Sequence, residues 1–146
     1  MMTVLTKNPE ETIAFAKKLG SLLKIGDIIA YKGGLGAGKT TFTRGLAVGI
    51  GLDDNVTSPT FSIVNEYRGK INLYHFDMYR IINSEELEAT GFYDYPLDES
   101  IFAIEWSENI ADILPPDTIF VTIELIDSET RKITVEGDER FADAWN

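Results

Sequence analysis

The hydrophobic positions of the chain follow two patterns: stripes that repeat every three or four residues, and short continuous apolar runs. The stretch 8–24 shows the first pattern, with Asn8 at the N-cap position, Pro9 at the first helical position and Glu11 at the third. Its inward stripe consists of Ile13, Ala16, Leu19 and Leu23. This arrangement predicts an amphipathic helix.

The segment from 26 to 51 combines both patterns around a glycine-rich loop. Residues 26–33 form an apolar run that is typical of a buried strand. The stretch 39–50 predicts a helix ending near Gly49 and Gly51, with an inner stripe of Phe42, Leu46 and Ile50. A strand, a glycine loop and a helix in this order form the unit from which a parallel sheet is built.

The remaining chain predicts more strands than helices. Residues 61–67 and 71–77 flank the short link 68–70 and predict an inserted β-hairpin. Further strands are predicted at 100–106, 118–126 and 131–137, short helices at 83–90 and 107–114, and a frayed tail at 138–146. We therefore predict an α/β fold of the P-loop NTPase-like, three-layer α/β/α kind, with a mixed sheet and an inserted hairpin.

The glycine loop has the spacing of a phosphate-binding loop, or Walker A motif: Gly33, four residues, then Gly38, Lys39 and Thr40. Glycines let backbone N–H groups curl around phosphate oxygens, and the following helix adds the positive end of its dipole. We expect Lys39 to reach the β- and γ-phosphates of a nucleotide and the Thr40 hydroxyl to bind Mg²⁺.

A triphosphate site also requires a carboxylate near the metal and a group that orients the attacking water. Asp77 and Glu105 each close an apolar strand. Glu105 is the predicted metal-side residue, because its strand is the more continuously apolar one, and Asp77 then serves the water or a partner. The candidate catalytic residues are Lys39, Asp77 and Glu105.

Three other features have both a functional and an ordinary interpretation. The segment 57–61 is placed where a switch would reach the γ-phosphate, with a hydroxyl on Thr60 and a turn held by Pro59, but it also suits a plain strand-entry turn. His75, the only histidine, excludes a His-based metal cluster and is otherwise a polar strand residue with a nearby hydrogen bond. Trp106 is either core or a partner-facing anchor.

The composition of the chain limits the kinds of molecule that the protein is expected to bind directly. The formal net charge of −11 would repel a polyanion, so any role with nucleic acid is expected to run through a partner protein. The chain has no cysteine, which excludes disulfides and thiolate metal sites. Its first 25 residues have no apolar stretch of signal-peptide or membrane-span length, so a cytoplasmic protein without membrane or DNA contacts is the expectation.

Five segments, taken together, resemble one family. They read GGLGAGKTTFTRGL, SPTF, YHFDMYR, EELEATGFYDY and IEWSE, in this order. In so short a chain they are similar to TsaE, the small ATPase family of bacterial threonylcarbamoyladenosine biosynthesis. The resemblance implies a single ATPase domain over 1–146 that uses ATP and Mg²⁺ and works with TsaB and TsaD. That complex modifies position 37 of tRNAs reading codons that begin with adenine, and tRNA would be contacted only indirectly.

The resemblance also implies roles for individual residues. Mg²⁺ binding falls on Thr40 and Glu105, and an activity-critical role on Asp77 and Trp106. Adenine-side contacts fall near Thr6 and near Arg131 or Lys132. Phosphate binding is carried onto Gly33, Gly34, Leu35, Gly36, Ala37, Gly38, Lys39, Thr40 and Thr41, and the switch onto Ser58, Pro59, Thr60 and Phe61.

Three other functions remain open at this stage. A small-molecule kinase uses the same loop, although the segment after residue 117 predicts strands where a basic lid would be expected. A GTPase is disfavoured, since no Asn-Lys-x-Asp pattern occurs. A non-catalytic ATP sensor that controls complex assembly has the same ligands as an ATPase, so the residues alone do not separate the two.

Overall fold

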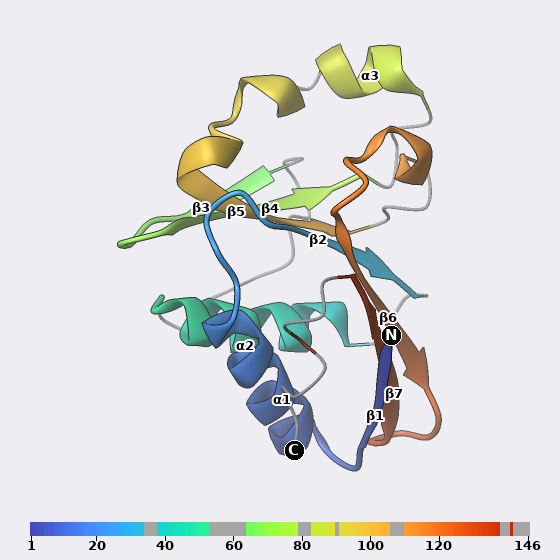
Figure 1. Cartoon of the computed structure of the whole chain (residues 1–146). Coiled ribbons are helices and arrows are strands. Elements are labelled where there is room, and N and C mark those ends of the chain that lie inside the picture. Colours follow the sequence, from blue (N-terminus) through green and yellow to red (C-terminus); the bar gives the residue numbers. More distant parts are fainter. Residues whose placement is uncertain are drawn as a thin grey trace.

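The protein folds around one mixed β-sheet (Figure 1). The computed structural model describes residues 1–33, 38–52, 64–78, 83–89, 91–105, 110–137 and 141. The strands are β1 (Met2–Thr6), β2 (Ile28–Lys32), β3 (Val64–Tyr67), β4 (Asn72–Asp77), β5 (Ser100–Glu105), β6 (Ile119–Leu125) and β7 (Arg131–Glu136). The helices are α1 (Pro9–Ser21), α2 (Lys39–Ile50) and α3 (Ser84–Ala89), with 3₁₀ turns η1 (Phe92–Asp94), η2 (Leu97–Glu99) and η4 (Ala111–Ile113).

The described strands lie in the order β1-β7-β6-β2-β5-β4-β3. The inner strands β6, β2, β5 and β4 are parallel, whereas β7, β1 and β3 join by antiparallel pairing. In Figure 1 the sheet twists so far that β1, β7 and β6 run steeply across the direction of β3, β4 and β5. The parallel centre matters for the site, because ligands of such sheets bind at the carboxyl ends of the strands.

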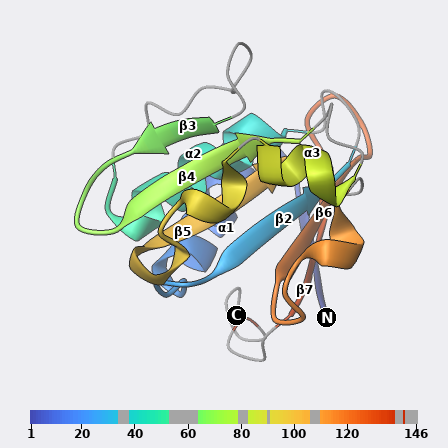
Figure 2. The same ribbon diagram turned by 90° about the horizontal axis from the view of Figure 1, so that it is seen from above.

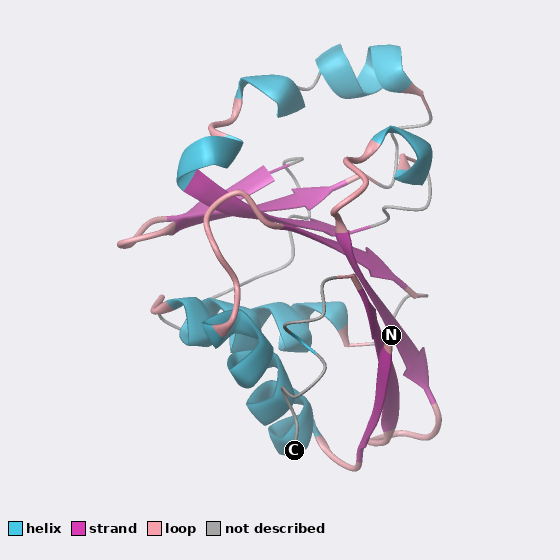
Figure 3. Ribbon diagram, in the orientation of Figure 1, coloured by secondary structure: helices cyan, strands magenta, loops and turns pink. Residues whose placement is uncertain are grey.

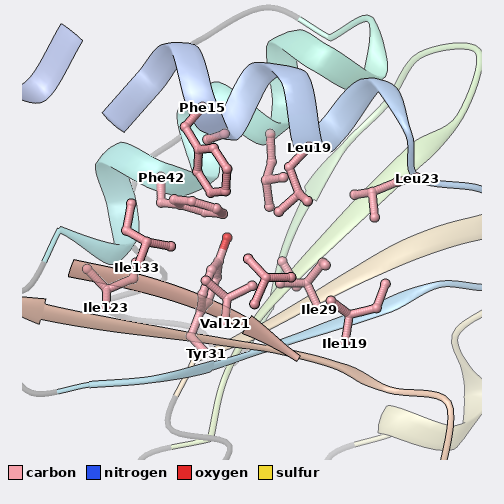
Figure 4. Close-up of a cluster of buried hydrophobic side chains, with 14 of the residues drawn as sticks. Phe15, Leu19, Leu23, Ile29, Tyr31, Phe42, Ile119, Val121, Ile123 and Ile133 are labelled. Carbon is pink, nitrogen blue, oxygen red and sulfur yellow. The ribbon is translucent and has the colours of Figure 1, made fainter. Parts of the chain in front are cut away.

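Helices α1 and α2 cover one face of the sheet and form the larger core with it (Figure 4). Phe15 of α1 and Phe42 of α2 meet with ring centroids 6.2 Å apart, above the fully buried Tyr31 of β2. The two helices pack closely at Gly45, because this residue has no side chain. A Cβ at Gly45 would come within 2.6 Å of the Ala16 Cβ. This contact fixes where the amino end of α2 lies on the sheet.

Short helices form the other layer. Figures 2 and 3 show α3 and the 3₁₀ turns over β4, β5 and β2. Their side chains bury a second, aromatic cluster in which Phe76 and Phe102 lie 5.0 Å apart, centroid to centroid, and Phe92 closes it from above. The predicted α/β architecture with a mixed sheet is therefore confirmed, with a thin second helical layer.

Most predicted elements occur at their expected positions, and the differences concern details. Strand β1 was not predicted, although Val4 and Thr6 point inward in alternation with exposed neighbours. The helix predicted over 107–114 is a single 3₁₀ turn at Ala111–Ile113 where it is described. The tail predicted to fray includes Phe141, which is 2 % exposed and belongs to the larger core; an isolated aromatic gives no periodic signal.

The inward stripe of α1 also differs from the prediction. Its fully buried apolar residues are Phe15, Ala16 and Leu19, whereas Ile13 is only half-buried. The aromatic ring takes the central place because it fills the space above Tyr31 and Phe42. The predicted N-cap is confirmed, since the Asn8 side chain accepts a hydrogen bond from the Glu11 N–H.

Candidate nucleotide site

The amino end of α2 is built without a side-chain cap. Gly38 is its N-cap residue, with φ of +102°, and makes no side-chain hydrogen bond. No acidic residue stands in the first turn. Gly33, at the other end of the loop, also has positive φ, +141°, a conformation that favours glycine. The helix end therefore keeps its positive dipole uncompensated by any side chain of its own, as an anion site requires.

Lys39 lies at this helix end, and its side chain folds back toward Gly33. Its Nζ donates to the Gly33 carbonyl oxygen at 3.1 Å, and the residue is 6 % exposed. The ammonium group is thus held where the loop begins and the helix starts, which is where a phosphate chain would lie in a Walker A loop. Thr40, the predicted metal ligand, follows it in the first turn and is half-buried.

A buried hydroxyl chain anchors this turn to the sheet. The Thr43 hydroxyl donates to the Lys39 carbonyl at 2.8 Å, so the Tyr31 hydroxyl, 2.7 Å away, is the donor to Thr43. Burial raises the pKa of Tyr31 well above its usual range, and the nearby charge of Glu105 acts in the same direction. Tyr31 consequently stays neutral and keeps its hydrogen bond at any ordinary pH.

The two predicted carboxylates lie side by side. Asp77 ends β4, Glu105 ends β5, and their Cα atoms are direct partners in the parallel register. Glu105 falls one residue beyond the last registered pair of β2 and β5, Ala30 with Ile104, which brings it beside Tyr31. Paired residues in a sheet share a face, so both carboxylates lie on the α2 face at the carboxyl edge.

Glu105 has a partner that the sequence did not single out as one. Its Oε2 lies 2.7 Å from Nε2 of His75, and the two side chains are 7 % and 0 % exposed. The distance is that of an ion pair, but neither atom has the alignment of a regular hydrogen bond, and Nδ1 of His75 has no hydrogen-bond partner. The spacing of two within β4 places His75 and Asp77 on one face, a signal that was available in the sequence.

The residues present fit a magnesium ion that a nucleotide helps to hold. Buried Glu105 has one polar contact among the described residues, from Oε2 to His75, and that contact is not a regular hydrogen bond; Thr40 offers a hydroxyl. Among the described residues, no three His, Asp or Glu side chains gather as a metal cage. Mg²⁺ sites of nucleotide enzymes need none, since one or two protein ligands, phosphates and waters complete them.

The two residues proposed for the adenine side are neighbours on paired strands. Thr6 and Arg131 are Cα partners in the β1–β7 ladder. The Arg131 guanidinium reaches α2: its Nε lies 3.5 Å from where a Cβ on Gly38 would stand. Thr6 is fully buried and its hydroxyl lies 2.6 Å from that of Thr12, so any contact from Thr6 to a nucleotide would use its backbone.

Several predicted site residues lie outside the described part of the chain. They are Gly34, Leu35, Gly36, Ala37, Ser58, Pro59, Thr60, Phe61 and Trp106. Their assignments to phosphates, switch and partner stay predictions. Of the helices that the structure describes, none combines the length and apolar character needed to cross a membrane.

Comparison with known proteins identifies the family of this chain. The sequence model of the family described as threonylcarbamoyl adenosine biosynthesis protein TsaE matches residues 6–133. The tRNA threonylcarbamoyladenosine biosynthesis protein TsaE of Bacillus subtilis is 42% identical over 130 residues, covering 88% of this chain and 81% of the relative. That of Treponema pallidum is 34% identical over 134 residues, covering 92% and 99% respectively.

A solved structure shares the fold. The crystal structure of YdiB from Bacillus subtilis superposes with a TM-score of 0.76 at 34% sequence identity, covering 98% of this chain and 90% of that one. The family match spans most of the chain and includes every described site residue from Thr6 to Arg131. This chain belongs to the TsaE family.

Proposed function

We propose that this protein is a Mg²⁺-dependent ATPase that supports formation of threonylcarbamoyladenosine on tRNA. The observation that carries the proposal is the uncapped amino end of α2, over which Lys39 is held by the Gly33 carbonyl. The names of the relatives supply the pathway. Within that pathway we assign TsaB and TsaD as partners, a cytoplasmic site of action, and indirect contact with tRNA, since the net charge of −11 opposes direct binding.

The residues would divide the work as follows. Backbone N–H groups of the loop and the first turn of α2 hold the phosphates, and Lys39 exchanges the Gly33 carbonyl for phosphate oxygens. Thr40 and Glu105 would hold Mg²⁺, which when bound offsets charge on the phosphates. Asp77, paired with Glu105, lies one strand further from β2 and suits the orientation of the attacking water. Arg131, beside Gly38, would stack on the adenine.

The test is inorganic phosphate release from Mg·ATP, by the protein alone and with TsaB and TsaD. We expect release to rise with the partners and to fall at least about 100-fold in Lys39→Ala, because a buried charged hydrogen-bond partner of the phosphates is lost. Glu105→Ala should behave similarly. Lys32→Ala is the matched control: it removes the same charge near the loop, but Lys32 lies over the Phe120 ring, 4.5 Å from its centroid.

Other outcomes would separate the alternatives. ATP binding without phosphate release, under every condition, would replace the ATPase by an ATP sensor that controls assembly. Transfer of phosphate to a small acceptor would indicate a kinase. The absence of ATP binding would contradict the proposal altogether.

A further inference from the structure

The strongest unassigned feature is the buried pair of His75 and Glu105. His75 lies in the middle of β4, fully buried, and is the only histidine of the chain. Its Nε2 contacts Glu105 Oε2 at 2.7 Å. Glu105 is only 6 % exposed, so water compensates little of its charge. In the described part of the chain, His75 is the only ion-pair partner of this carboxylate. Burying a carboxylate with so little compensation is costly unless a further partner completes the site.

The contact runs diagonally across two strands. In register, His75 faces Ala103, and Glu105 faces Asp77 two residues further on. The imidazole therefore leans toward the carboxyl end of β5, and the small side chain of Ala103 leaves it room to do so. Leu73 and Ile101, both fully buried, lie on the same face one step toward the amino ends and form an apolar floor under the ring.

This packing has a consequence for the carboxylate. A glutamate side chain has several rotatable bonds, and fixing them costs entropy each time a ligand binds. Contact with the fully buried ring of His75 restrains one oxygen atom of Glu105 before a ligand binds and leaves the other for that ligand. The contact with His75 uses Oε2, so Oε1 is the oxygen that remains for a ligand. Groups that orient a metal ligand in this way commonly change metal affinity by about 10- to 100-fold when they are removed.

We propose that His75 is a positioning residue for Glu105, which it holds by Oε2 so that Oε1 is presented to the Mg²⁺ ion of the bound nucleotide or to a water on that ion. This inference rests on the proposed function. It gives a role to His75, the buried polar side chain of β4 that has none in the proposed binding of the nucleotide.

The test measures Mg²⁺ dependence of nucleotide affinity rather than turnover. ATP binding is titrated calorimetrically with EDTA and again with saturating Mg²⁺, and the ratio of the two dissociation constants is compared among variants. His75→Leu, which keeps apolar volume but has no polar nitrogen, should lose about tenfold or more of the wild-type ratio, with affinity in EDTA unchanged. His75→Gln, whose amide can reach the place of Nε2, should retain most of the ratio.

A control separates positioning from stability. Leu19→Ala truncates a fully buried residue of α1 in the core on the same face of the sheet, and it should lower the melting temperature while leaving the Mg²⁺ ratio intact. An unchanged ratio in His75→Leu would overturn the inference and leave the proposed function standing. Wild-type protein that binds ATP equally with and without Mg²⁺ would also overturn it. Wild-type protein that binds no ATP would overturn the proposed function itself.

Discussion

The first backbone N–H groups of a helix have no partner within the helix, and α1 and α2 differ in how these groups are satisfied. In α1 the Asn8 oxygen accepts from the Glu11 N–H at 2.8 Å, and the Glu11 carboxylate accepts from the Lys7 N–H at 2.9 Å. Pro9, at the first helical position, has no N–H to satisfy. In α2 a glycine stands at the cap, without a side-chain bond and without an acidic residue in the first turn.

The two helices have similar lengths, 13 and 12 residues, and share one core, so helix stability does not require the difference. A helix that satisfies its own N–H groups has no affinity left for an anion, whereas an uncapped one does. Contacts along the length of α2 stabilise it instead. They are the hydroxyl chain from Tyr31 through Thr43 to the Lys39 carbonyl and the close packing at Gly45. The comparison thus separates a helix start that is capped by its own side chains from one that is left open for the phosphates we propose it binds.

Giving α2 an acidic cap should have the largest effect. Gly38→Asp places a carboxylate where we expect the phosphates, and Gly38→Asn has nearly the same shape and the same backbone strain without the charge. We expect ATP to bind about 30-fold more weakly to the Asp variant than to the Asn variant, or about 2 kcal/mol. Titration calorimetry measures both. Equal affinities would show that the helix dipole is not what holds the anion.

Breaking the hydroxyl chain should have the next largest effect, on stability. Thr43→Val leaves the buried Tyr31 hydroxyl without its acceptor and should lower the free energy of unfolding by about 1.5 kcal/mol. Tyr31→Phe removes that donor and should cost less, because Thr43 keeps its bond to Lys39. Urea unfolding compares the two variants and the double variant. A smaller loss in Thr43→Val than in Tyr31→Phe would contradict the donor order.

Removing the cap of α1 should cost less and leave binding alone. Asn8→Ala deprives the Glu11 N–H of its acceptor and should lower the free energy of unfolding by about 1 kcal/mol. Asn8→Ser, which keeps an oxygen atom, is the control and should lose little. ATP affinity, measured on the same samples, should be unchanged in both. A clear loss of affinity would mean that the two helix ends are not independent.

The smallest effect concerns a turn that uses the same chemistry as the α1 cap. Asp127 Oδ1 accepts from the N–H groups of Glu129 and Thr130, and these bonds hold the pKa of Asp127 below its usual 3.8. The same turn positions Arg131, which donates to the Asp127 carbonyl. Because the folded-state pKa is lowered, the charged carboxylate stabilises the fold above pH 3.8, and this contribution disappears as the pH falls through the folded-state value.

Asp127→Asn resembles the protonated residue. The unfolding free energies of wild type and variant should differ slightly and by a constant amount between about pH 5 and 7, and the two curves should converge in acid. ATP affinity at neutral pH should change by less than about twofold, as for an exposed site. Curves that diverge in acid would reverse the sign of the argument.

Local patterns in the sequence predicted the elements that local interactions stabilise. The Asn8 cap, the extent of α2 and the glycines at both ends of the loop all follow from residues within one or two helical turns of each other. The Walker A spacing of the loop was recognisable for the same reason, because it is contained within eight residues. Strand β1 was not predicted, because it lies at the edge of the sheet and, among the described strands, pairs only with β7. Its short alternating pattern indicates a strand only when that partner is known.

The groups around the loop are brought together only by the tertiary structure. The β4–β5 register sets Asp77 beside Glu105 and lets His75 reach across Ala103, and a shift of β4 by one residue against β5 would have turned Asp77 and His75 to the opposite face. The β1–β7 pairing joins Thr6 to Arg131 over 125 residues of chain, which buries one and aims the other at Gly38. Sequence by itself determined which residues are the candidates for the proposed chemistry. Long-range strand pairing decided which of them meet, because each register is chosen by the packing of the whole sheet.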